Sequence, residues 1–188
     1  MGAIVDWVYE RAMSAIGSLP ADERADTYVV SFFVYDYEDD PRRPTLTIGT
    51  NTERQVVAMI HRASDGAEAR WNYVFWLQNE LATVGGPLDP DGERLIMSSF
   101  DAAGLWFADD DYSDEALAIG DEMTRRFVGQ CVQAALRMHE EGAVAAIFGR
   151  PIPGLVHELE YYDEIVGQNR RANPPGLTDD FAAWVESF

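Results

Sequence analysis

Apolar residues recur at helical spacing near the start of the chain and again, over a longer stretch, beyond its middle. Near the start, positions three or four apart predict an amphipathic helix that ends near Gly17: Ile4, Val8, Ala12, Ala15 and Leu19. The longest pattern runs from 113 to 141 and carries one apolar face: Met123, Phe127, Cys131, Ala134, Ala135 and Met138. Gly142 follows directly, as is common after a helix C-terminus. The sequence therefore predicts a long helix near 113–141.

Other segments favour strands. Residues 27–37 (TYVVSFFVYDY) are β-branched and aromatic on both faces, which indicates a buried strand. Residues 45–50 (TLTIGT) alternate between apolar and polar, and an acidic, Pro-containing turn separates the two segments, so we expect a hairpin. Further strands are predicted at 143–148 (AVAAIF), a compact apolar run, and at 153–160.

Shorter helices are expected between and after these strands. One starts after Thr50 or Thr52, because each is followed three residues later by Glu or Gln, the spacing of a capping box. Others are predicted at 94–107 and 161–171. A further short helix at the end of the chain is expected to be capped by Thr178. It carries three aromatic residues: Phe181, Trp184 and Phe188.

The order of these elements indicates the fold class. The 188 residues contain no repeat or linker, and a domain has about 100–200 residues, so we expect one domain over 1–188. Runs of helices and strands without regular alternation predict an α+β fold, with helices covering one face of a mostly antiparallel sheet. Hydrophobic residues make up 47% of the chain, which is ample for a core.

Charge narrows the choice of partners. The chain has 33 Asp and Glu against 14 basic residues, all of them Arg, and a formal net charge of -19. Nucleic acids and anionic membranes would repel such a surface, so neither is expected as a partner. A basic protein is favoured instead, or the charge serves only solubility. The absence of Lys excludes a Walker lysine and Schiff-base chemistry.

The start of the chain bears on location. Residues 1–19 carry Asp6, Glu10 and Arg11 and lack a basic leader, so they predict a helix and not a signal peptide. No apolar run approaches the roughly 20 residues of a membrane-spanning helix. We therefore expect a cytoplasmic protein.

Few residues suggest catalytic or metal chemistry. Cys131 is the single cysteine and falls on the apolar face of the long helix, so it is expected to be a buried core thiol. His157 is a weak catalytic candidate, since it lies in a predicted strand beside several acids. Asp89 and Asp91 resemble the start of a calcium loop, but Phe100 stands where the final Glu would be. No metal and no cofactor is predicted.

Two kinds of residue are candidates for binding a partner. The acidic candidates, which complement a basic surface and would speed encounter with it, are Asp36, Glu38, Asp39, Asp40, Asp109, Asp110 and Asp111. The aromatic candidates belong to residues 71–81, a stretch whose pattern fits either helix or strand. They are Trp71, Tyr73 and Trp76, and the hydrophobic core is the favoured alternative for them.

Three segments together resemble a bacterial family known as domain of unknown function 4303. They are the predicted hairpin followed by Asn51-Thr52-Glu53, residues 69–73 (ARWNY), and the tail from Pro153 through Asn173-Pro174 to Trp184. Members of that family are associated with toxin and immunity gene neighbourhoods. The resemblance implies a small cytoplasmic protein without established enzymatic activity, and it supplies no catalytic residues for this chain.

We therefore expect a non-enzymatic protein-interaction domain, and an immunity-like binder of a basic toxin is the specific form that the resemblance implies. A first alternative is a hydrolase-like enzyme with a site made of His157, carboxylates and Arg. A second alternative is a structural or regulatory subunit of a larger complex.

Overall fold

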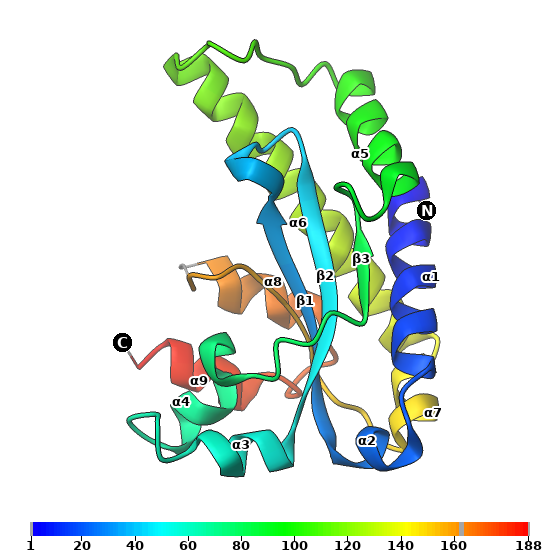
Figure 1. Cartoon of the computed structure of the whole chain (residues 1–188), viewed down its shortest axis with the longest axis vertical. Helices are drawn as coiled ribbons and strands as arrows, with labels where there is room; N and C mark the ends of the chain where they lie inside the picture. Colours follow the sequence, from blue (N-terminus) through cyan, green and yellow to red (C-terminus); the bar gives the residue numbers. More distant parts are fainter. Residues whose placement is uncertain (1, 162–163, 188) are drawn as a thin grey trace.

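A four-stranded sheet with the order β3-β2-β1-β4 organises the computed structural model, which describes residues 2–161 and 164–187 (Figure 1). Strands β1 (Thr27–Asp36) and β2 (Pro44–Thr52) form the predicted antiparallel hairpin, and β3 (Ala82–Val84) extends it on the side of β2. Strand β4 (Gly154–His157) pairs with β1 in parallel. The α+β class with a mostly antiparallel sheet is confirmed.

The helices have the following bounds: α1 Ala3–Gly17, α2 Ala21–Asp26, α3 Glu53–Met59, α4 Gly66–Trp71, α5 Pro90–Ala102, α6 Asp114–Glu140, α7 Ala143–Phe148, α8 Glu164–Ala172 and α9 Asp179–Val185. Short 3₁₀ turns cover Tyr37–Asp39 and Tyr73–Phe75. The predicted long helix is α6. Its N-cap is Ser113, whose hydroxyl oxygen accepts a hydrogen bond from the Ala116 N–H at 3.2 Å. None of the described helices combines the length and apolarity needed to cross a bilayer.

Helices cover both faces of the sheet, so the prediction of a single covered face is wrong. On one face, Val30 and Phe32 of β1 join a core with α1 and α6. On the other face, Tyr28 and Val29 pack with Trp71 of α4 and other residues of α4, α8 and α9. The physical reason lies in β1, because a strand that is apolar on both faces must bury both of them.

Helix α8 is attached to β4 by side-chain amides. The Asn169 Oδ1 atom accepts from the Val156 N–H at 2.8 Å, and the Asn169 Nδ2 atom donates to the Val156 carbonyl at 2.9 Å. Asn173, just past the helix, bonds to both backbone groups of Gly154 in the same way, at 2.8 and 2.9 Å. Four helical residues span about 6 Å and two strand residues about 6.6 Å, so the two pairs match. These bonds fix the position of α8 beside the sheet.

The structure corrects the element predicted at 143–148, which is the helix α7 and not a strand. Val144 and Phe148 lie four residues apart and are buried, whereas the residues between them are exposed or half-buried. Gly142 and Gly149, with φ of 71° and 72°, bound the segment in left-handed conformations that glycine adopts without strain. An apolar run this short fits a strand and a buried helix equally well.

The observed ends of several other helices and strands differ from the predicted ones. The helix predicted at 94–107 is α5, which starts at Pro90 and ends at Ala102. The strand predicted at 153–160 is limited to β4. The helix at 161–171 is present as α8, although residues 162–163 lie outside the described part of the chain. Thr178 precedes α9 without a side-chain cap, and Phe188 is not among the described residues.

A candidate acidic binding cleft

The tip of the β1–β2 hairpin lies beside the segment that leads into α6. Both parts carry acidic residues that were candidates for binding a partner, and they are far apart in the sequence. At the tip, Glu38 and Asp39 both have φ of 57°, a left-handed backbone that non-glycine residues rarely adopt. Such conformations cost about 1–3 kcal/mol each and persist where the surrounding contacts hold them. Here Arg43 bonds to the Glu38 side chain, and Arg42 bonds to the neighbouring Asp40.

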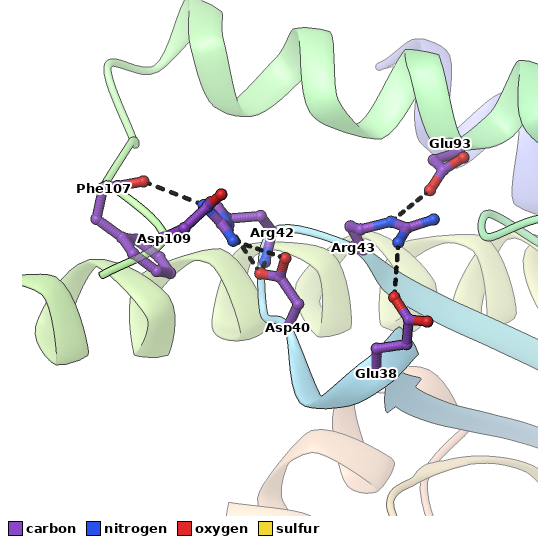
Figure 2. Close-up of polar contacts among 7 residues, drawn as sticks. All are labelled: Glu38, Asp40, Arg42, Arg43, Glu93, Phe107 and Asp109. Atoms are coloured by element: carbon purple, nitrogen blue, oxygen red, sulfur yellow. Dashed lines mark hydrogen bonds and ion pairs between the residues drawn. The ribbon is translucent and has the colours of Figure 1, made fainter. Parts of the chain in front are cut away.

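Arg42 joins the two acidic segments (Figure 2). Its Nε and NH2 atoms donate to the two carboxylate oxygens of Asp40, at 2.8 and 2.9 Å. Its NH1 atom donates to the Phe107 carbonyl at 3.3 Å and to Asp109, which lies 67 residues away in sequence. Burial raises the pKa of Asp40, but the hydrogen bonds and charge of Arg42 outweigh burial and lower it below the ordinary value. Asp40 therefore stays ionised.

Arg43 holds the other side of the hairpin tip (Figure 2). Its Nε atom donates to Glu93 of α5 at 2.8 Å, and its NH1 atom donates to Glu38 at 3.2 Å. Its guanidinium also lies 4.5 Å from the centre of the Tyr37 ring, a favourable cation–π distance. The tip is thus tied both to α5 and to the loop before α6.

Between the hairpin tip and the start of α6 lies a cleft of about 520 Å³, which we call the acidic cleft. Seven acidic residues and one arginine, Arg42, are among those that line it. The acids are Asp36, Glu38, Asp39, Asp40, Asp109, Asp111 and Asp121. Tyr112 and Leu117 also line it, and they are 83% and 60% exposed. The cleft therefore combines concentrated negative charge with accessible aromatic and aliphatic surface.

Six of the seven predicted acidic candidates line the acidic cleft, while Asp110 is exposed outside its lining. Sequence reasoning missed Arg42, Tyr112, Leu117 and Asp121. Tyr112 follows the acidic run 109–111 directly, so its position was a usable signal. Nothing in the sequence pairs Arg42 with Asp109, because that contact depends on the tertiary fold.

Asp36, the last residue of β1, lines the acidic cleft. It is half-buried, and its Oδ1 atom is buried without a hydrogen-bond partner among the described residues. Burial, and after it the charges of Glu158, Asp40 and Asp39, raise the pKa of Asp36 from 3.8 to about 6. Asp36 also lines a second, larger cavity of about 870 Å³.

The aromatic candidates lie elsewhere, in the core. Trp71 and Trp76 are 5% and 4% exposed and pack in the cluster around Tyr28, while Tyr73 is half-buried. A side chain with so little exposed area offers no contact surface, so we place both tryptophans in the core and not at an interface. The same stretch does expose Val74.

His157 is inaccessible to a substrate. It is 1% exposed and lines neither the acidic cleft nor the larger cavity. Its Nδ1 atom faces the Glu158 carbonyl at 3.1 Å and so donates, while Nε2 accepts from the Ser31 hydroxyl at 2.8 Å. Burial lowers the pKa of His157 to about 4, so the ring is neutral at pH 7. Although Ser31 and His157 resemble part of a catalytic triad, the surrounding rings of Phe33 and Tyr73 leave no approach.

Cys131 is fully buried, as predicted, and burial raises the pKa of its thiol. Over residues 2–161 and 164–187, no three His, Cys, Asp or Glu side chains lie close enough together to hold a metal ion. A comparison of the chain with protein family models, with curated proteins and with solved structures gives no match in any of the three.

Proposed function

We propose that this chain is a protein-binding domain that holds a basic segment of its partner in the acidic cleft. One observation carries the proposal. Two acidic loops far apart in sequence line the same cleft of about 520 Å³, and Arg42 joins them there. Because carboxylates repel one another, gathering them in one cleft without a partner lowers the stability of the fold.

The lining of the cleft fits a protein partner in particular. Charged residues give speed of association and specificity, while buried aromatic and aliphatic contacts supply most of the binding energy. Tyr112 and Leu117 provide such contacts beside Asp109 and Asp111. A partner segment that alternates basic and apolar side chains would contact both the carboxylates and the exposed apolar side chains of the cleft.

An immunity-like role is the specific form of this proposal. It rests on the resemblance to the bacterial family described above and on the net charge of -19, which complements a basic toxin. The partner would then be a toxin whose basic active surface is covered by the acidic cleft.

The test compares two variants of equal charge. Asp109→Asn with Asp111→Asn removes two charges from the cleft, and Asp22→Asn with Glu23→Gln removes two exposed charges from α2, at the opposite end of the molecule in Figure 1. Tagged proteins are used for affinity purification from the native host at low salt, and bound proteins are identified by mass spectrometry.

We expect wild type and the α2 variant to retain one stoichiometric basic protein that about 0.5 M salt releases, and the cleft variant to lose it. If the cleft variant retains the same partner as wild type, the acidic cleft is not the binding site. If no protein is retained by wild type, the proposed function itself is rejected.

A further inference from the structure

The larger cavity lies near the carboxyl ends of two parallel strands, β1 and β4. Asp36 is the last residue of β1, and Glu158 follows His157, which ends β4 opposite Phe33 of β1, so both residues lie toward the same end of these strands and both line the cavity. Helices α6 and α8 form the walls, and the cavity measures about 870 Å³. Crevices at the carboxyl ends of parallel strands are common positions for small ligands.

Two glycines keep the walls open. Gly129 lies inside α6 and Gly167 inside α8, and both line the cavity. A Cβ atom added at Gly129 would meet nothing within 4 Å, and one at Gly167 would meet only the Arg171 guanidinium, at 3.6 Å. Glycine inside a helix costs about 1 kcal/mol relative to alanine. Helix stability would therefore favour alanine at both positions. Glycine instead leaves the space beside the helix free for a ligand.

The cavity has an excess of carboxylates. Asp36, Asp121, Glu158 and Glu164 line it, against Arg125 and Arg171. Arg125 is already paired with Glu122, outside the lining, at 2.9 Å. The Oδ1 atom of Asp36 is buried and has no hydrogen-bond partner among the described residues. A positively charged donor placed there would pair with the carboxylate and offset the repulsion between Asp36 and Glu158.

We propose that this cavity binds a small organic cation through a guanidinium or primary ammonium group, with the carboxylates of Asp36 and Glu158 as its anchors. Sites for small molecules typically measure about 300–1,000 Å³, and the cavity of about 870 Å³ falls within this range. One side chain of a partner protein would fill only a small part of it. This site stands on the cavity alone and does not depend on the proposed protein partner.

The first measurement is calorimetric titration of the full chain with three probes at low salt and pH 7.5: agmatine, spermidine and citrate. We expect one equivalent of agmatine or spermidine to bind and citrate not to bind. Asp36→Asn should weaken binding about tenfold or more, since the cation then faces a neutral amide in place of a carboxylate and loses a charge-assisted hydrogen bond.

A cavity-filling variant separates this site from general attraction to an acidic surface. Gly167→Leu places a side chain in the cavity without altering any charge, so we expect it to abolish binding. Gly17→Leu is the matched control at the end of α1, where an added Cβ meets nothing within 4 Å. Circular dichroism establishes that both variants are folded, and a Gly129→Leu variant replaces Gly167→Leu if the latter is not.

Three results would overturn the proposal. The first is that neither cation binds more tightly than about 1 mM. The second is that a folded Gly167→Leu or Gly129→Leu variant binds as wild type does, which would indicate adsorption to the surface. The third is that an arginine-containing peptide binds while agmatine does not, which would assign the charged group to a protein partner. The first two results do not bear on capture of a protein by the acidic cleft, which the affinity purification tests separately.

Discussion

Replacing Asp36 by Asn should stabilise the protein at neutral and alkaline pH. Burial and the nearby charges of Glu158, Asp40 and Asp39 raise the pKa of Asp36 from 3.8 to about 6, so ionisation is costlier in the folded state than in the unfolded chain. When folding raises the pKa of an acid, ionisation of that acid destabilises the folded state relative to the unfolded chain. Stability is therefore lost as the pH rises from about 4 to about 6, and the full cost persists above that range.

The magnitude follows from the pKa values. A rise from 3.8 to about 6 corresponds to about 3 kcal/mol, at about 1.4 kcal/mol for each tenfold change in the proton-binding constant. Asp36 is only half-buried, so solvent screens part of this cost, and we expect a gain of about 1–2 kcal/mol from Asp36→Asn at pH 8.

Urea unfolding followed by tryptophan fluorescence measures the gain at pH 8 and at pH 4. The matched control is Asp110→Asn, which removes the same charge from an exposed position and should change stability by less than about 0.5 kcal/mol. At pH 4 the wild-type Asp36 is already protonated when folded, so the difference between Asp36→Asn and wild type should nearly vanish. Equal gains for both variants at pH 8, or a gain for Asp36→Asn that persists at pH 4, would refute the reasoning.

Three further outcomes are expected. Asn173→Ala should cost about 2–4 kcal/mol in urea unfolding, because it removes two buried hydrogen bonds to Gly154 and leaves that backbone unpaired; a loss below about 1 kcal/mol would contradict this. Gly49→Ala should destabilise by about 1–3 kcal/mol, because its Cβ would lie 2.5 Å from the Asn79 carbonyl oxygen, and an unchanged melting temperature would disprove the clash. Burial lowers the pKa of His157 from 6.5 to about 4, so wild type should lose up to about 3 kcal/mol as the pH falls through that range, and a His157→Gln variant that keeps the same slope would reject this assignment.

Local signals in the sequence were sufficient for several elements. The helix α6 was predictable because its apolar face, the capping Ser113 and the terminal Gly142 agree with one another. The hairpin was predictable because an apolar run and an alternating run flank a short turn. At 143–148 the local pattern was ambiguous, and the conformations of Gly142 and Gly149, which sequence does not reveal, decide for a helix.

The two concave sites depended on information that local patterns lack. Sequence identified the acidic segments 36–40 and 109–111 separately, but their meeting depends on the packing of the hairpin against the start of α6. The larger cavity was missed, because it requires β4 to pair in parallel with β1. A signal did exist, since Gly129 and Gly167 both interrupt predicted helices where alanine would be more stable.

Strand β4 is an outer strand of the sheet, and its attachment to α8 has a consequence for self-association. An outer strand normally presents unpaired N–H and C=O groups, onto which an extended chain can add. Here the amides of Asn169 and Asn173 occupy those of Val156 and Gly154, so the two side chains act as a substitute for a fifth strand. A second copy or an unfolded chain therefore finds no template at this edge. Loss of Asn173 would reopen it, and would convert a local defect into a site for edge-to-edge aggregation.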